Sequence, residues 1–251
     1  MGRKRRKGRP INGWLVIDKD QGETSTGVVS AVRRLTRAQK AGHGGTLDPI
    51  ATGVLPIALG EATKTVPYVV EATKSYRFEV RFGAARDTDD AEGEVVATSD
   101  RRPSDAEIEA ALPRFRGAIL QTPPRYAAVK IDGERAYDLA RRGETVELEP
   151  RPVDIHALTL IARPEADRAV LEMTCGKGAY VRAVARDLGD VLGCYGYVVA
   201  LRRLAVGGFR ADDAVTLATL ERLVDDDALP QALVSLTTAL ADIPALAVTE
   251  P

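Results

Sequence analysis

Residues 42–53 restrict the local backbone more than any other stretch, with four glycines around a histidine and an aspartate. The stretch reads Gly-His-Gly-Gly-Thr-Leu-Asp-Pro-Ile-Ala-Thr-Gly. Glycine reaches positive φ and lets a backbone approach a ligand closely, whereas Pro49 holds the backbone of Asp48 in extended conformations. A carboxylate on such a stiff point can act as a nucleophile or a base. A tight turn in which Asp48 bonds only its own backbone is an equally consistent interpretation.

Length and composition exclude several classes of protein. At 251 residues and 45% hydrophobic content, the chain can form one large domain or two small ones. No apolar run approaches the roughly 20 residues of a membrane span, and the basic N-terminus lacks the apolar core of a secretory signal. Cys175, Cys194, His43 and His156 form no ligand-spaced cluster. We therefore expect a cytoplasmic protein with no metal, no cofactor and no membrane partner.

Charge is distributed unevenly along the chain, although the net charge is only −1. Residues 1–82 carry 15 Lys and Arg against 7 Asp and Glu, a net charge of +8. Residues 83–110 have a net charge of −6 (3 against 9), and residues 211–251 of −7 (1 against 8). A local positive face suits phosphate contacts whatever the whole-chain charge, although ordinary surface variation would also give such blocks.

Hydrophobic periodicity predicts alternating strands and helices. Lys74–Phe82 alternates strictly, with Tyr76 and three apolar residues on one face, which is typical of a half-buried strand. Thr24 or Ser25 can cap a helix whose residues Val28, Val29, Val32 and Leu35 share one face. Further strands are expected over residues 13–17, 54–60, 153–163 and 169–175, and helices over residues 62–70, 103–112, 134–142, about 181–192, and twice within 212–243.

Residues 42–53 are similar to the signature of the TruB-type tRNA pseudouridine synthases, with Gly44 in place of the usual Thr or Ala. Five further stretches resemble motifs of this family in the expected order. They are Lys19-Asp20-Gln21-Gly22-Glu23-Thr24-Ser25 (with Asp20 for Pro), Gly83–Gly93, Pro123–Lys130 (with Ala127 for Ser) and Gly178–Arg182, followed by Leu201–Phe209 at the end of the catalytic domain. The resemblance covers about residues 12–210.

The resemblance implies a mixed α/β (α+β) fold with a largely antiparallel central sheet. It implies isomerisation of uridine to pseudouridine at position 55 in the T loop of tRNA, without a cofactor. Asp48 would be the catalytic carboxylate and Arg182 the cation that keeps it charged. His43 would replace the flipped-out base, Tyr76 would stack on it, and Tyr180 and Leu201 would line its pocket. Lys130 and Lys64 are expected to contact phosphate or to be structural.

The predicted organisation has three parts. Residues 1–11 form a disordered basic arm, residues 12–210 the catalytic domain, and residues 211–251 a helical segment that resembles the approach to a PUA-type RNA-binding domain. The partner is the T-arm stem-loop of tRNA, bound by a monomer. Two alternatives remain at this stage. One is a non-catalytic tRNA-folding or RNA-binding protein, and the other is a nucleosidase, although no second acid occupies a comparable motif.

Overall fold

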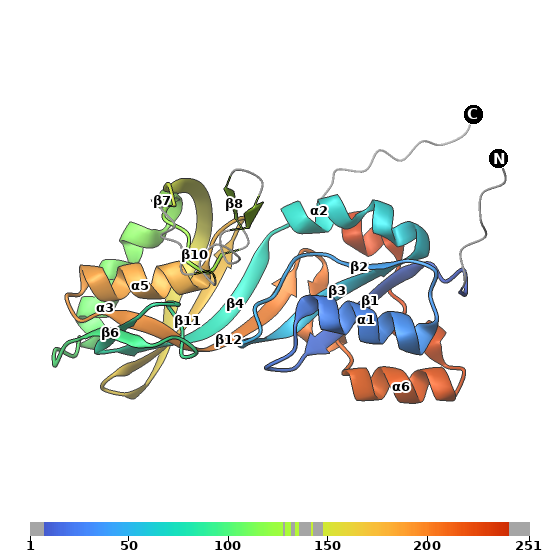
Figure 1. Cartoon of the computed structure of the whole chain (residues 1–251). Coiled ribbons are helices and arrows are strands. Elements are labelled where there is room, and N and C mark those ends of the chain that lie inside the picture. Colours follow the sequence, from blue (N-terminus) through green and yellow to red (C-terminus); the bar gives the residue numbers. More distant parts are fainter. Residues whose placement is uncertain (1–7, 128, 132–133, 136–141, 143–147, 241–251) are drawn as a thin grey trace. The chain divides into compact units, whose positions relative to one another are not determined.

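The computed structural model describes residues 8–127, 129–131, 134–135, 142 and 148–240. The chain divides into two compact units (Figure 1). Unit 1 comprises Met1–Lys74 and Arg202–Pro251, and unit 2 comprises Ser75–Leu201. Unit 1 is therefore discontinuous in sequence, and unit 2 is inserted into it. The predicted arm at residues 1–11 lies mostly outside the described residues, but Arg9 forms a backbone bridge with Ala38, so its last part is ordered.

Unit 1 contains an antiparallel sheet built on the long strand β3. Strand β3 pairs with β1 and β2, and the C-terminal half of β12 lies beside it and pairs with β13. The strands are β1 (Gly13–Lys19), β2 (Ala41–His43), β3 (Ala51–Leu59), β12 (Gly196–Val206) and β13 (Phe209–Arg210). Strand β3 begins three residues earlier than its apolar run predicts, and Gly53 in this extension pairs with Lys19 of β1.

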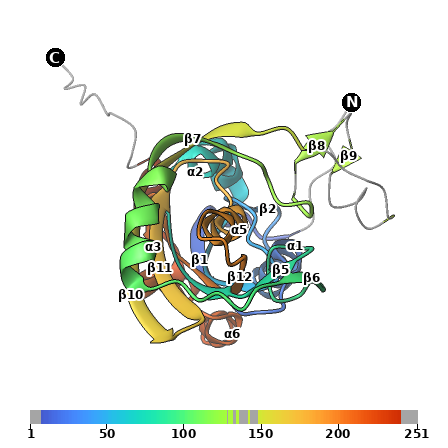
Figure 2. The same cartoon turned by 90° about the vertical axis from the view of Figure 1, so that its left-hand side faces the viewer.

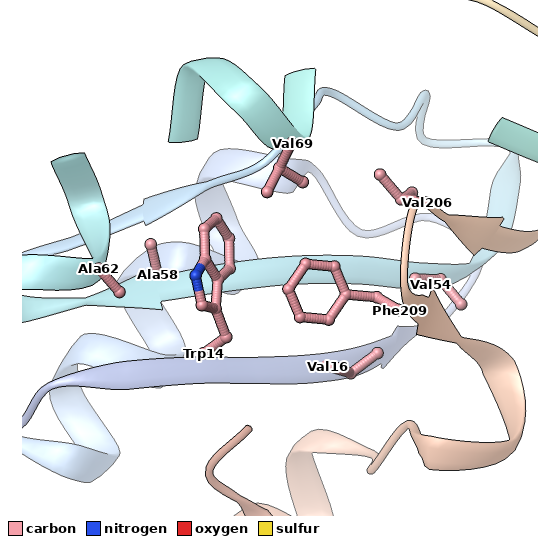
Figure 3. Close-up of a cluster of buried hydrophobic side chains, with 8 residues drawn as sticks. All are labelled: Trp14, Val16, Val54, Ala58, Ala62, Val69, Val206 and Phe209. Carbon is pink, nitrogen blue, oxygen red and sulfur yellow. The ribbon is translucent and has the colours of Figure 1, made fainter. Parts of the chain in front are cut away.

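The core of unit 1 gathers around Trp14, which is completely buried (Figure 3). Its ring lies 5.2 Å from that of Phe209, measured between centroids, at an angle of 44°. Its indole Nε1 donates a hydrogen bond to Thr65, as a buried tryptophan requires. The other members come from β1, β3, η1, α2 and β12: Val16, Val54, Ala58, Ala62, Val69 and Val206. Segments from both ends of the chain therefore share one core.

Helices surround this sheet. The N-cap of α1 (Ser25–Thr36) is Thr24, which accepts a hydrogen bond from the Gly27 N–H, as predicted. The other helical elements are η1 (Gly60–Lys64), α2 (Val66–Glu71), η3 (Ala211–Asp213), α6 (Leu217–Asp225), η4 (Leu229–Ala232) and η5 (Leu236–Leu240). The two acidic helices predicted after residue 211 are thus wrong in detail. Only α6 is an α-helix, and Pro230 lies in a short 3-10 turn. Residues 241–251 lie outside the described part.

Unit 2 is built on a curved sheet in the order β12, β4, β11, β10, β7. Strands β10 and β11 are antiparallel neighbours, as predicted, and β7 pairs antiparallel with β10. The strands are β4 (Lys74–Phe82), β7 (Gly117–Gln121), β10 (Arg151–Glu165) and β11 (Arg168–Cys175), with the N-terminal half of β12. Phe78, Val80 and Phe82 of β4 are buried while Arg77 and Arg81 are exposed, so the predicted alternation is confirmed.

Helices α3 (Asp105–Ala111) and α5 (Val181–Val191) accompany this sheet in the described part of the chain. Figure 2 looks along α5, which the curved strands of unit 2 partly surround. Val184 and Leu188 are buried as expected, but Val191 is 39% exposed, because it lies in the last turn of the helix. Helix α3 begins at the predicted capping box between Ser104 and Glu107 and runs into η2 (Leu112–Phe115).

The described part of unit 2 also contains two small hairpins: β5 (Ala84–Arg86) with β6 (Val95–Thr98), and β8 (Lys130–Ile131) with β9 (Glu134–Arg135). The helix predicted over residues 134–142 is wrong at its start, since residues 134 and 135 form β9. Residues 136–141 lie outside the described part. The expected fold class is confirmed, because the protein is α+β with a mostly antiparallel sheet.

Candidate active site

Asp48 lies between β2 and β3 in unit 1 and is half-buried. Its carbonyl accepts a hydrogen bond from the Ala51 N–H at 3.0 Å, which closes a turn over Pro49 and Ile50. Leu47 and Ile50, on either side, are almost fully buried. The turn is therefore anchored by apolar side chains, while the carboxylate between them keeps access to solvent.

Ser25 holds the residue before Asp48. Its buried hydroxyl accepts a hydrogen bond from the Leu47 N–H at 2.8 Å and donates one to the Leu47 carbonyl at 2.9 Å. The Ser25 side chain, at the start of α1, thus satisfies both the backbone N–H and the backbone carbonyl of Leu47. Thr24 alone caps α1, so capping does not explain Ser25. The contact with Leu47 does explain it.

Lys19 holds the residue after Asp48. Its side chain is fully buried, and its ammonium donates hydrogen bonds to the carbonyls of Asp20, Glu23 and Pro49 at 2.8, 2.8 and 3.3 Å. Burial lowers the pKa of Lys19, and the nearby Arg203 cation lowers it further. The negative charges of Glu23, Asp48 and Asp20 act in the opposite direction. Asp48 therefore lies in the field of a desolvated cation within its own unit.

Arg203, only 1% exposed, holds the glycine-rich part of the same loop. Its guanidinium donates to the carbonyls of Gly45 (3.1 Å), Thr46 (3.2 Å) and Val54 (2.7 Å). Sequence reasoning placed Arg203 and Lys19 in motifs without giving them a role. The alternation of side chains along a strand could have indicated that both cations are buried. It places Arg203 on the same face as Leu201, and Lys19 on the same face as Leu15 and Ile17.

The other predicted residues of unit 1 are more peripheral. His43 ends β2, opposite Ile57 of β3, and is half-buried. Lys64 is exposed and forms an ion pair with Glu61, which also pairs with Lys40 at 3.4 Å. Hydrogen bonds from Lys64 and then Lys40 lower the pKa of Glu61. Lys64 thus already has a surface partner, and surface pairs of this kind exchange easily with other anions.

In unit 2, Tyr180 is fixed at the start of α5 by a residue that sequence reasoning overlooked. The amide of the buried Gln121 accepts from the Tyr180 N–H at 2.8 Å and donates to its carbonyl at 3.2 Å. Tyr76, near the start of β4, is half-buried, and Leu201 on β12 is 8% exposed. Gln121 therefore fixes the backbone of Tyr180.

Arg182 is 5% exposed and is held from three directions within unit 2. Its guanidinium donates to the carbonyls of Thr88 (3.0 Å) and Tyr126 (3.1 Å) and lies 3.4 Å from a carboxylate oxygen of Asp90. The other Asp90 oxygen accepts from the Thr88 hydroxyl at 2.6 Å. The Gly83–Gly93 loop therefore supplies the carboxylate that lies beside Arg182.

One turn further along α5, Arg186 repeats this arrangement. It pairs with Asp89 at 2.9 Å and donates to the Thr122 carbonyl at 2.8 Å. Burial raises the pKa of Asp89 to about 6, although the charges of Arg186 and Arg182 oppose the shift. Burial lowers the pKa of Arg186, but Asp89 and Asp187 outweigh it, so this pKa is raised. Two consecutive aspartates thus tie the loop to two successive turns of α5.

The structure groups the candidate residues by unit. His43, Asp48 and Lys64 belong to unit 1, and Tyr76, Tyr180, Arg182 and Leu201 to unit 2. Lys130 begins β8, and its side chain lies outside the described part. A cavity of about 210 Å³ in unit 1, lined by Tyr68, Phe209 and Ala239 among others, includes none of these residues.

No three His, Cys, Asp or Glu side chains in the described part of the chain are grouped so that they could hold a metal ion. Among the described helices, none combines the length and apolar character needed to cross a membrane.

Two family models match consecutive parts of the chain. Residues 33–181 match the N-terminal domain of the TruB family of pseudouridylate synthases, and residues 182–241 match a C-terminal domain of tRNA pseudouridylate synthase B. The chain is also 58% identical, over 249 residues, to a protein of Cereibacter sphaeroides called tRNA pseudouridine synthase B, and covers 82% of it. It is 60% identical over 246 residues to a protein of the same name from Dinoroseobacter shibae, of which it covers 81%.

Solved structures agree with this similarity. A chain from a crystal structure of a Cbf5–Nop10–Gar1 complex superposes with a TM-score of 0.72 at 25% identity, over 91% of this chain and 61% of that one. A chain from an H/ACA ribonucleoprotein bound to a substrate RNA has the same fold, with a TM-score of 0.70 at 22% identity. With the loop around Asp48 and the motif order already established, these matches confirm the expected family. The chain belongs to the TruB family and is a tRNA pseudouridine synthase, an enzyme that forms pseudouridine in tRNA.

Proposed function

We propose that the enzyme acts on uridine 55 in the T loop of tRNA and that Asp48 is its catalytic carboxylate. The observation that supports this proposal is that side chains hold the backbone of the loop on both sides of Asp48. Ser25, Lys19 and Arg203, from three separate segments, bond the peptide groups on both sides of Asp48. Its carboxylate is thereby presented from a rigid backbone, which is what a group that must meet one atom of a substrate requires.

The reaction is an isomerisation, so the composition of the nucleoside does not change, although the hydrogen on C5 is released to solvent. The C1′–N1 bond breaks, the uracil ring turns, a C1′–C5 bond forms, C5 loses its proton and N1 gains one. A carboxylate can assist by covalent attack or by stabilising an oxocarbenium-like sugar, and both attack at C1′ and attack at C6 are consistent with Asp48. Either route needs the ionised form of the carboxylate.

Substrate-binding roles are proposed for the remaining residues. A uridine must leave its stack before it can react, which costs a few kcal/mol, and RNA loops are recognised through such splayed bases. We propose that His43 takes the place of that base, that Tyr76 stacks on it, and that Tyr180 and Leu201 line its pocket. We also predict that Arg182 is the partner of Asp48. Phosphate contacts by Lys130 and Lys64 are predicted as well. We further predict that the enzyme acts as a monomer and works in the cytoplasm, where tRNA is used.

The proposal is tested with Asp48→Asn, which keeps the shape of the side chain and removes its charge. Tritium release from tRNA carrying 5-tritiated uridine should fall below detection, while the tRNA dissociation constant stays within about threefold and the circular dichroism spectrum is unchanged. Asp213→Asn, an exposed carboxylate in the same unit, should keep full activity. Substrate tRNA with cytidine at position 55 should release no tritium. Turnover by Asp48→Asn, or undiminished release from the altered tRNA, would refute the corresponding part.

A further inference from the structure

Four arginines gather at the C-terminal end of α1 in unit 1, on the opposite end of this helix from Ser25. Arg33 and Arg34 lie in the last turn and Arg37 is the C-cap. Arg9 comes from a different segment, but its N–H donates to the Arg37 carbonyl at 2.7 Å, which brings it to the same place. All four side chains are exposed. We call Arg9, Arg33, Arg34 and Arg37 the α1 arginine cluster.

The α1 arginine cluster differs from other cations of unit 1 in its lack of partners. Within the described part of the chain, no ion pair or hydrogen bond involves these four side chains. The remaining described Lys and Arg residues of unit 1, apart from Arg210, each bond a carboxylate, a carbonyl or a hydroxyl: Lys19, Lys40, Lys64, Lys74, Arg202, Arg203 and Arg222. Four neighbouring positive charges are thus left without neutralisation.

Helix stability does not account for this arrangement. Cations in the last turn of a helix favour it by about 0.3–1 kcal/mol through the macrodipole, which would explain Arg33 and Arg34. It does not explain Arg9, which belongs to no helix. Helix α6 lies alongside α1 (Figure 1) and carries Glu221 and Asp225, yet neither forms an ion pair with the cluster in the described structure. The cluster therefore presents its charge to an external anion.

The position of the cluster relative to Asp48 follows from α1 itself. Ser25, the first residue of the helix, bonds Leu47 beside Asp48. At 1.5 Å per residue, the 12 residues of α1 extend about 18 Å. At roughly 3.4 Å per nucleotide along a helical strand, this corresponds to about five nucleotides. An RNA whose uridine reaches Asp48 thus has backbone available at the distance of the cluster.

We propose that the α1 arginine cluster binds the phosphate backbone of the tRNA outside the target loop, about five nucleotides from the reacting uridine. This inference rests on the proposed role of Asp48 only for the distance between the cluster and the reacting uridine. The cluster supplies affinity and takes no part in the chemistry. Contacts of this kind depend on salt, because each releases counterions from the nucleic acid.

The test compares two triple variants of the full chain with the same loss of charge. The cluster variant is Arg33→Gln, Arg34→Gln and Arg37→Asn, where Asn suits the positive φ of 54° at that C-cap. The control is Arg114→Gln, Arg151→Gln and Arg210→Gln, three exposed arginines that belong neither to α1 nor to the cluster. Binding to unmodified tRNA is measured between 50 and 200 mM salt, and single-turnover rates at saturating tRNA.

We expect the cluster variant to raise the dissociation constant about tenfold or more at 100 mM salt. The slope of log K against log salt should become shallower by about two to three, since three phosphate contacts are lost. Its saturating rate should stay within about twofold, in contrast to Asp48→Asn, which keeps affinity and loses the rate. The control should lose less than threefold in affinity. Equal losses in both variants, or an unchanged slope in the cluster variant, would overturn the proposal, provided that both retain the native circular dichroism spectrum.

Discussion

At the scale of single residues, the loop around Asp48 depends on buried cations that bond carbonyl groups rather than carboxylates. Arg203 is the clearest case, because its guanidinium serves three carbonyls at once. The planar guanidinium offers five N–H donors in a fixed fork, whereas a lysine ammonium is a compact charge on a flexible stem. The identity of the cation, and not only its charge, should therefore matter at this position.

We expect Arg203→Lys to lower the free energy of unfolding by about 2–4 kcal/mol, because buried carbonyls lose charged donors. Turnover should fall at least about tenfold as the loop loses its fixed position. Urea unfolding and tritium release measure the two effects. Arg202→Lys is the matched control, since its pair with Asp18 is partly exposed and should contribute less than about 1 kcal/mol. Equal effects at both positions would contradict this interpretation.

Gly44 is a second residue whose identity the tertiary structure explains. A Cβ at this position would lie 2.6 Å from Cγ1 of Val69 and 3.2 Å from the Trp14 ring. The resemblance suggests Thr or Ala here, so the bulky Trp14 and the packing of Val69 account for the glycine. We expect Gly44→Ala to destabilise the protein by about 1–3 kcal/mol through overpacking. Adding Val69→Ala should recover part of this loss in a double-mutant cycle, and strict additivity would refute the explanation.

At the scale of elements, helix α5 and the loop before β6 are joined by two arginine–aspartate pairs. The pairs differ in function as well as in position. Arg182 belongs to the proposed substrate-binding set, whereas Arg186 bonds Thr122 in the segment that leads toward β8. Because Asp89 and Asp90 are adjacent, displacing one would disturb the other, and the loop should respond to pH as one element.

The raised pKa of Asp89 gives the expected pH dependence. Its pKa is about 6 in the folded protein against 3.8 as the ordinary value, so the folded state binds this proton more tightly. The resulting stabilisation is complete below about pH 4 and is lost as pH rises through 6. Relative to Asp89→Asn, the wild type should therefore gain about 1–3 kcal/mol between pH 7.5 and pH 4. Urea unfolding of both proteins across this range measures it, and a difference that does not vary with pH would contradict the assignment.

At the scale of the whole molecule, unit 1 is assembled from both ends of the chain, with all of unit 2 between them. Phe209 lies far from Trp14 in sequence, yet the rings contact each other in the core (Figure 3). This arrangement requires contacts of large sequence separation, which cost more loop-closure entropy than local ones. The stability of the unit around Asp48 should consequently depend on residues near the C-terminal end.

We expect Phe209→Ala to destabilise unit 1 by about 3–5 kcal/mol through the cavity that it leaves. Trp14 is the only tryptophan, so its fluorescence reports on this core directly. The urea midpoint of the fluorescence transition should fall clearly for Phe209→Ala. Phe209→Leu, which fills more of the space, should lose less than about 1.5 kcal/mol. A fluorescence midpoint that Phe209→Ala leaves unchanged would show that the ring contact does not support unit 1.

The sequence by itself determined the family, the strict alternation of β4, the caps of α1 and α3, and the stiff loop that carries Asp48. Each of these depends on neighbours within a few residues or on a motif read in order. Only the tertiary structure decided that Lys19 and Arg203 hold that loop, that Gln121 fixes Tyr180, and that Asp90 pairs with Arg182. The start of the helix predicted over residues 134–142 is wrong for a more local reason, because residues 134 and 135 pair with β8 instead. Partners that lie up to about 160 positions apart leave no local pattern, so only the folded chain brings them together.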